Sequence, residues 1–191
     1  MKQGNADFLA GTLESLRTDE ERRAEIAHVQ APFAVLVGCS DSRVSPELLF
    51  RVGLGEIFTV RNAGNSVDKV AMGSVEYGVL VLGAPLILVL GHQRCGAVEA
   101  SVEAVQQGTV FPGSIGSLIE PIIPSVLSAV EAGIPDGEEL VDAVVRDNVR
   151  RTVERLRTSE PSLEDALQAG TLRVVGAEYS LDEGRVDFFL E

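Results

Sequence analysis

Short apolar runs separated by amphipathic stretches occupy most of this chain. Residues 33–38, 57–60 and 86–90 are almost uniformly apolar, which is typical of strands buried on both faces of a parallel sheet. Residues 172–177 and 185–190 predict two further strands. The turn Asp182-Glu183-Gly184 lies between them, so we expect these two strands to form a hairpin.

Helical patterns fill the intervals between the strands. Ser45, Pro46 and Glu47 are typical of a helix start, with the Ser45 hydroxyl expected as the cap. Polar and apolar spacing predicts helices over 46–50, 67–82, 95–107 and 117–132, the last interrupted by prolines. A longer helix follows from one apolar stripe, formed by Leu140, Val144, Val149, Val153 and Leu156.

This alternation predicts an α/β fold. We expect a central parallel four-stranded sheet with an antiparallel fifth strand at an edge, and helices on both faces. No repeat or linker divides the chain, so a single domain over 1–191 is expected. Residues 1–30 would form a charged helical arm that packs on the domain or on a second subunit, and residues 31–191 the core.

The net charge of the chain limits the classes of partner that it can be expected to bind. Sixteen basic and 29 acidic residues give a net charge of −13, which argues against nucleic acid or a membrane surface as a partner. No apolar run reaches the ~18 residues of a membrane span, and the first residues do not resemble a signal peptide. We therefore expect a soluble, cytoplasmic protein. Reduced thiols there favour metal ligation, nucleophilic catalysis or core packing for Cys39 and Cys95 over a disulfide.

Three soft metal ligands lie just past the ends of two buried strands. Cys39 follows the first strand, and His92 and Cys95 follow the third with i, i+3 spacing. If these strands are neighbours, the three side chains converge at the carboxyl edge of the sheet. Two thiolates and an imidazole suit zinc and leave a fourth position for water. Taken singly, each cysteine could instead be inert core and the histidine a helix cap.

Asp41 and Arg43 follow the first cysteine and are close enough in sequence to form an ion pair. The pair could simply stabilise the loop. It could also keep Asp41 ionised beside the metal, where the carboxylate would ligate the metal or accept a hydrogen bond from its hydroxide.

Two motifs of the chain resemble those of a known family. The motifs Cys39-Ser40-Asp41-Ser42-Arg43 and Gly91-His92-Gln93-Arg94-Cys95-Gly96-Ala97 resemble those of the β-class carbonic anhydrases. The resemblance covers nearly the whole chain, because further stretches are similar at 4–8, 30–33, 55–65, 74–77 and 174–179. The resemblance implies one zinc ion per subunit and the reversible hydration of carbon dioxide to bicarbonate and a proton, through a zinc-bound hydroxide. It also implies the fold inferred above, with a homodimer or a dimer of dimers.

The resemblance assigns roles to single residues. Cys39, His92 and Cys95 match the zinc ligands, and Asp41 and Arg43 match the catalytic dyad. In some members the matching aspartate closes the site by becoming the fourth ligand. Those members carry a tryptophan three residues before the first cysteine, where this chain has Leu36, which argues against regulation by bicarbonate. Val44, Arg61 and Tyr77 match those members as well, so Leu36 alone does not decide the position of Asp41. We expect an open site.

Four further residues match the substrate pocket, which in the family lies at a dimer interface. Gln30 matches a glutamine that hydrogen-bonds substrate, and the backbone N–H of Gly96 matches a donor to substrate or bicarbonate. Phe58 and Tyr77 match the aromatic lining.

The expected zinc ligands also imply a pH dependence. Two thiolates cancel the formal charge of zinc, so activity is expected to rise into the alkaline range.

The sequence leaves two alternative functions open. The same site could hydrolyse carbonyl sulfide or carbon disulfide, which are isoelectronic with carbon dioxide. The protein could also be a non-catalytic, zinc-stabilised structural or assembly protein, although Asp41 and Arg43 are both present.

Overall fold

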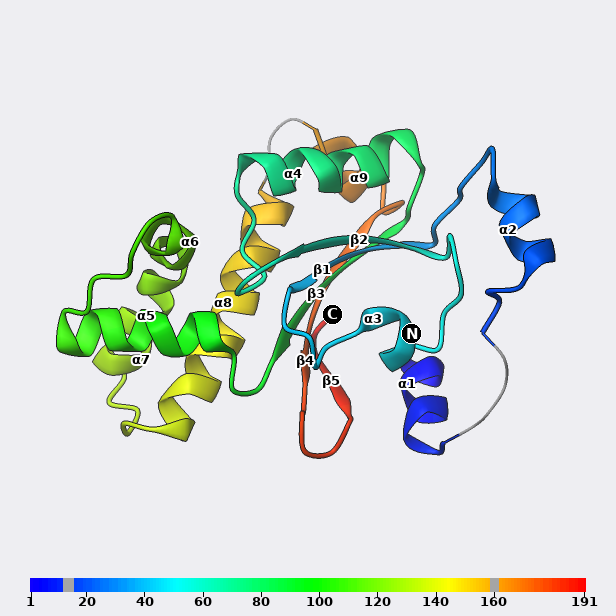
Figure 1. Ribbon diagram of the computed structural model, residues 1–191. Helices are drawn as coiled ribbons and strands as arrows, with labels where there is room; N and C mark the ends of the chain where they lie inside the picture. The colour runs from blue at the N-terminus through cyan, green and yellow to red at the C-terminus, as the bar shows by residue number, and fades with distance from the viewer. Residues whose placement is uncertain (12–15, 159–161) are drawn as a thin grey trace.

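A five-stranded sheet forms the centre of the computed structural model, which describes residues 1–11, 16–158 and 162–191 (Figure 1). The strand order is β2-β1-β3-β4-β5. The strands are β1 (Ala34–Cys39), β2 (Ile57–Asn62), β3 (Leu86–His92), β4 (Arg173–Tyr179) and β5 (Val186–Leu190). All five fall where the apolar runs predict them.

The sheet is mixed as expected. β1 is parallel to both β2 and β3, and β3 is parallel to β4. β5 is antiparallel to β4 and ends the sheet, so the predicted hairpin is confirmed. Because β1 lies between β2 and β3, the chain reverses its direction of winding at β1. This is the place where ligands bind in open α/β sheets.

One face of the sheet is covered by α4 (Lys69–Glu76), a π-helical turn (Tyr77–Val81), α8 (Glu138–Arg157) and α9 (Glu164–Gln168). The predicted stripe of α8 is fully buried. Its Val149 packs so closely that a Cβ on Gly91 or Gly176 would lie 2.7 or 2.8 Å from its methyl groups. Glycines in β3 and β4 therefore let α8 lie directly on the sheet backbone.

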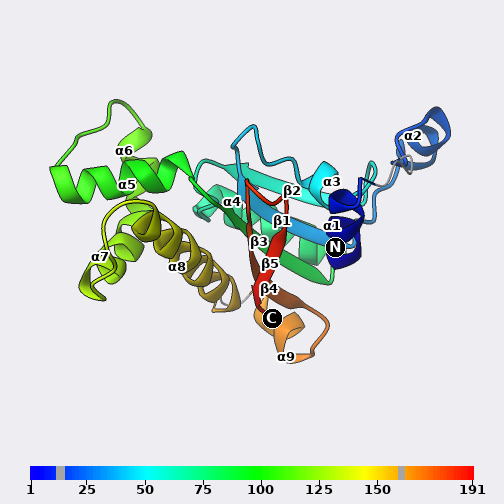
Figure 2. The same cartoon turned by 90° about the horizontal axis from the view of Figure 1, so that it is seen from below.

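The other face is covered by α1 (Lys2–Leu9) and α3 (Pro46–Leu49), whose neighbours include Phe50 and Phe188. α1 packs on the domain itself. The buried Asn5 donates to the carbonyls of Leu49 and Gly184 and accepts from the Val186 N–H. α2 (Glu20–Ile26) lies apart from the sheet (Figures 1 and 2). Part of the expected arm, residues 12–15, lies outside the described residues.

A third cluster of apolar side chains lies beyond the carboxyl edge of the sheet. It joins the first half of α8 to a helical lobe of α5 (Gly96–Gln107), α6 (Ile115–Ile119), a 3₁₀ turn (Glu120–Ile122) and α7 (Ile123–Glu131). Figure 2 shows this lobe to one side of the sheet. Cys39 and Cys95 are members of this cluster, so the candidate ligands lie where the lobe meets the sheet.

Local details differ from the predictions. The Ser45 hydroxyl makes no capping hydrogen bond, although the helix begins at Pro46 as expected. Pro121 and Pro124 divide the predicted 117–132 helix into α6, the 3₁₀ turn and α7, because proline lacks the N–H that helix continuation needs. α9 is too short to show a helical period and was not expected. Across the described parts of the chain, no helix is both long and apolar enough to cross a membrane.

Candidate metal centre

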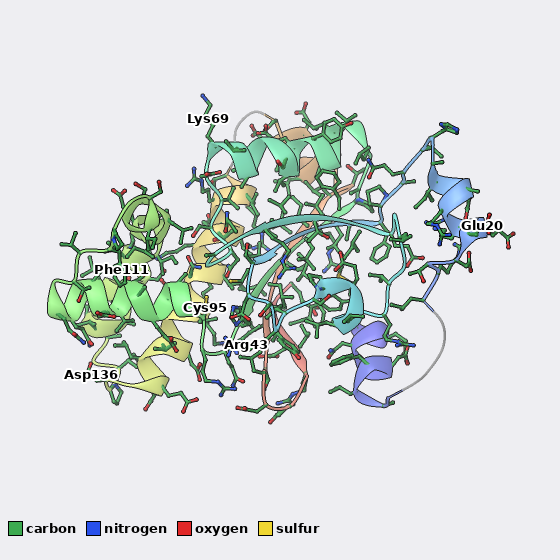
Figure 3. All side chains as sticks on the ribbon, in the orientation of Figure 1. Glu20, Arg43, Lys69, Cys95, Phe111 and Asp136 are labelled. Atoms are coloured by element: carbon green, nitrogen blue, oxygen red, sulfur yellow. The ribbon has the colours of Figure 1, made fainter. Side chains whose placement is uncertain are left out.

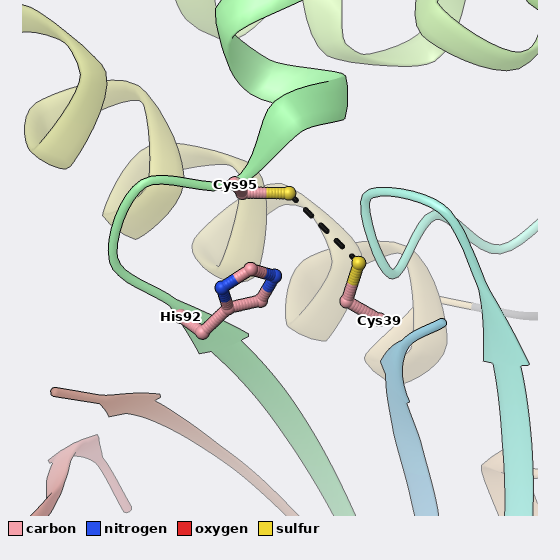
Figure 4. Close-up of side chains that lie close together, drawn as sticks. All are labelled: Cys39, His92 and Cys95. Atoms are coloured by element: carbon pink, nitrogen blue, oxygen red, sulfur yellow. Dashed lines mark hydrogen bonds between the residues drawn. The ribbon is translucent and has the colours of Figure 1, made fainter. Parts of the chain in front are cut away.

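Two strand ends and one helix start bring three soft ligands together. Cys39 is the last residue of β1, His92 is the last residue of β3, and Cys95 directly precedes α5. The Cys39 and Cys95 sulfurs lie 3.9 Å apart, and the ligand atoms of all three residues lie within 4.8 Å of one another. Figure 4 shows the imidazole turned toward the two sulfurs. The predicted convergence is confirmed, because β1 and β3 are neighbours.

The donor set fits a metal ion. His92 is fully buried, and its Nδ1 donates to the Gln93 carbonyl at 2.9 Å, which leaves the lone pair on Nε2. That Nε2 is buried without a hydrogen-bond partner among the described residues. An orphaned imidazole nitrogen beside two sulfurs is the arrangement that zinc satisfies.

The contact between the two sulfurs shifts the pKa values of their thiols in opposite directions. The hydrogen bond from Cys95 lowers the pKa of the Cys39 thiol to about 4, and the same contact raises the pKa of the Cys95 thiol. The Gly64 N–H also donates to the Cys39 sulfur at 3.3 Å. A thiolate is the form that binds metal, so the lowered pKa favours the ligating form of Cys39.

Asp41 lies beside the cluster in a fixed orientation. Arg43 donates through Nε to Oδ1 at 2.9 Å and through Nη2 to Oδ2 at 2.7 Å. Its backbone N–H adds a third bond at 2.9 Å. The side-chain hydrogen bonds from Arg43 lower the pKa of Asp41 to about 2. The ionised carboxylate reaches to 3.9 Å from His92 Nε2, so it faces the metal position while Arg43 holds both its oxygens.

Arg43 and Cys95 lie near each other at the edge of the sheet (Figure 3), and their loops are tied together. Arg43 Nη2 donates to the Arg94 carbonyl at 3.1 Å. Arg94 binds the Asp182 carboxylate of its own chain through two hydrogen bonds of 2.7 and 2.9 Å. Arg61 holds the other loop by donating to the carbonyls of Cys39 and Asp41.

Gly96 also lies at the cluster. It is the exposed first residue of α5, directly after Cys95. The first N–H groups of a helix have no partner within the helix and attract negative charge. Gly96 is therefore placed where a donor to an anion would be useful.

The other pocket residues lie elsewhere in the same chain. Phe58 pairs with Val35, four residues before Cys39, which is about 13 Å along the strand. The Tyr77 ring lies 6.1 Å from the Phe58 ring, and Tyr77 and Gln30 line one surface pocket of about 660 Å³. A single chain therefore does not bring Gln30, Phe58 and Tyr77 to the metal ligands.

Sequence reasoning did not single out the residues that support the ligands. The role of Arg61 as a clamp depends on the geometry of the loop, which the sequence does not reveal. Asn148 donates to the Gly64 carbonyl at 2.8 Å from within α8. The signal in the sequence that could have indicated Asn148 is its position as a polar residue within the apolar stripe of a helix.

Fold and site thus define an α/β protein with a Cys-His-Cys cluster, suited to a metal ion, at the switch point of its sheet. The family model described as "Carbonic anhydrase" matches residues 34–186. A carbonic anhydrase of Mycolicibacterium smegmatis is 42% identical over 187 residues, covering 98% of this chain and 89% of that protein. Carbonic anhydrase 2 of Mycobacterium tuberculosis is 41% identical, with coverage of 97% and 87%.

Solved structures agree with these relatives. The β-carbonic anhydrase of Coccomyxa, solved in complex with acetazolamide, has a TM-score of 0.76 and 32% identity, and covers 88% of this chain and 76% of that chain. The chain belongs to the β-carbonic anhydrase family, a family of enzymes.

Proposed function

We propose that this protein catalyses the reversible hydration of carbon dioxide to bicarbonate and a proton, with zinc held by Cys39, His92 and Cys95. The observation that carries the proposal is the buried cluster itself, in which two sulfurs and an orphaned Nε2 lie within 4.8 Å of one another. Zinc bound there would supply Lewis acidity and make hydroxide available near neutral pH.

Asp41 orients the nucleophile in this proposal. An ionised carboxylate can only accept hydrogen bonds, so Asp41 fixes the O–H of the attacking hydroxide and leaves an oxygen lone pair free to face carbon. Arg43 keeps the carboxylate ionised and occupies both of its oxygens. That contact supports the open form of the site, because Asp41 would have to leave Arg43 to become a ligand.

Negative charge builds up on the substrate oxygens as bicarbonate forms. The Gly96 N–H at the start of α5 is proposed to stabilise this charge, helped by the dipole of a 12-residue helix. The donor is backbone, so it needs no reorganisation during the reaction.

The apolar wall of the pocket is proposed to come from a second copy of the chain. In one chain the pocket residues are open to solvent: Tyr77 is 48% exposed, and the neighbouring Val29 and Val81 are 67% and 63% exposed. Exposed apolar side chains around a pocket are typical of a contact surface. Gln30, Phe58 and Tyr77 of the partner subunit would then complete each metal site in a homodimer or a dimer of dimers.

The test is a stopped-flow carbon dioxide hydration assay on protein whose zinc content has been measured. We expect stoichiometric zinc and hydration that acetazolamide, the ligand of the Coccomyxa relative, inhibits. Zinc-loaded protein that fails to hydrate carbon dioxide would refute the proposal. A parallel assay with carbonyl sulfide measures the alternative reaction, which no comparison supports.

A further inference from the structure

The turn after β2 contacts the metal centre through its backbone. Gly64 lies in this turn with φ of +80° and donates its N–H to Cys39 Sγ at 3.3 Å. A Cβ at this position would lie 2.6 Å from the Ile122 Cδ1 atom and 3.1 Å from the Ala97 Cβ atom. Only glycine fits here, and Figure 4 shows this turn next to Cys39.

Glycine alone does not fix the direction of that N–H. Its backbone is the most permissive of all residues, so the two peptide units that meet at Gly64 are oriented by the contacts they make. One unit carries the N–H that faces Cys39, and the other carries the carbonyl. That carbonyl accepts a hydrogen bond of 2.8 Å from Asn148 Nδ2.

Asn148 is placed to impose this orientation. It is 3% exposed and lies on α8 among buried valines, including Val145 and Val149. These valines pack on Gly91, the residue before His92. Burying an amide in an apolar stripe costs free energy unless its hydrogen bonds are made. The amide therefore joins a rigid helix to the turn that contacts a metal ligand.

We propose that Asn148 is a positioning residue of the metal centre: it holds the Gly64 carbonyl so that the Gly64 N–H stays on the Cys39 sulfur. The inference rests on the proposed zinc site and extends it. An N–H that donates to a ligating thiolate draws negative charge from the sulfur, which orients the ligand and tunes the metal. Removing such a supporting contact typically lowers metal affinity by roughly 10- to 100-fold.

The test compares Asn148→Leu, which has the same branched side-chain skeleton but no donor, with Thr152→Val. Thr152 lies four residues further along α8 and is also buried, so it controls for the general effect of removing a buried polar group. Each protein is loaded with zinc, and its dissociation constant is measured by competition with a chelator. Each is also loaded with cobalt(II), and the sulfur-to-cobalt charge-transfer band is recorded.

We expect Asn148→Leu to bind zinc at least about 10-fold more weakly and to shift the band to longer wavelength, whereas Thr152→Val should change neither. A band and an affinity equal to those of the wild type, even with a lower melting temperature, would show that Asn148 is only structural. If the wild type bound neither metal, the proposed function would fail as well. These two failures are therefore distinguishable.

A second measurement covers the case in which Asn148→Leu does not fold. Wild-type protein and Asn148→Ser, whose hydroxyl is too short to reach the Gly64 carbonyl, are loaded with cadmium-113. A scalar coupling between cadmium and the Gly64 amide proton is expected in the wild type and should be weaker in Asn148→Ser. Absence of the coupling in the wild type, or equal coupling in both proteins, would overturn the inference.

Discussion

The separation of Phe58 and Tyr77 from the metal ligands makes a quantitative prediction about mixed dimers. Phe58 lies about 13 Å from Cys39 along the strands of one chain, and Tyr77 packs against Phe58, so each complete site should take its ligands from one subunit and its wall from the other. Two variants test this: Cys39→Ser removes a ligand, and Gln30→Ala removes an exposed wall residue. Gln30 is exposed, and Cys39→Ser exchanges one buried sulfur for a smaller oxygen, so both chains should fold.

The expected activities follow from counting sites. A heterodimer of the two variants contains one site with intact ligands and an intact wall, and one site that lacks both. It should show about half the activity of the wild-type dimer, and a random one-to-one mixture about one quarter. Each variant alone should show little activity. Co-expression with two different affinity tags isolates the heterodimer, and stopped-flow hydration measures its rate.

A matched control gives the opposite outcome. In a heterodimer of wild type with the double variant Cys39→Ser/Gln30→Ala, neither site is complete, so activity should be low. If each chain carried its own complete site, this control would keep about half the activity. The heterodimer of Cys39→Ser with Gln30→Ala would then show only the mean activity of the two single-variant dimers. These two results together would refute the shared site.

Further predictions follow from the site and the core. Cys39→Ser should lose zinc and activity together, as metal analysis and the hydration assay would show, whereas retained stoichiometric zinc would contradict the ligand assignment. Asp41→Asn should keep zinc but lose most turnover, because it removes the acceptor that orients hydroxide; full activity would show that the dyad role is wrong. Wild-type activity should rise from neutral into alkaline pH, because two thiolates cancel the formal charge of zinc. Since Arg43 lowers the pKa of Asp41 to about 2, this carboxylate stays ionised throughout, so the alkaline rise should persist in Asp41→Asn with a lower plateau; a wild-type plateau already reached at pH 6 would contradict the charge argument. Val149→Ala should lower the free energy of unfolding by about 2 kcal/mol, as measured in urea. The control Val110→Ala, at a side chain 91% exposed, should leave it nearly unchanged.

Sequence reasoning predicted the sheet and α8 because their signals are strong and local. The apolar runs of β1 and β3 and the stripe from Leu140 to Leu156 permit few other structures. The π-helical turn at Tyr77–Val81 and the 3₁₀ turn before α7 could not be predicted, since they depend on how each segment packs on its neighbours. The missing Ser45 cap has the same origin: residue type favours a cap, but the local geometry decides whether the bond forms.

The metal ligands could be predicted for a related reason. Parallel neighbouring strands carry their last residues to the same edge, so Cys39 and His92 had to meet once β1 and β3 were adjacent. The contacts that support them join segments far apart in the chain, as Asn148 and Gly64 do, and no spacing rule reports such pairs. The pocket residues show the same limit, because the register of β2 on β1 places Phe58 far from Cys39.

The position of the wall residues has a consequence for how activity depends on dilution. A lone subunit would keep its ion, because all three ligands come from one chain, but it would offer carbon dioxide no enclosing surface. Specific activity should therefore fall as the protein is diluted below the dissociation constant of the dimer, while the metal content stays constant. A substitution that weakens the subunit contact would then lower activity as a substitution at the site does, although all three metal ligands remained in place.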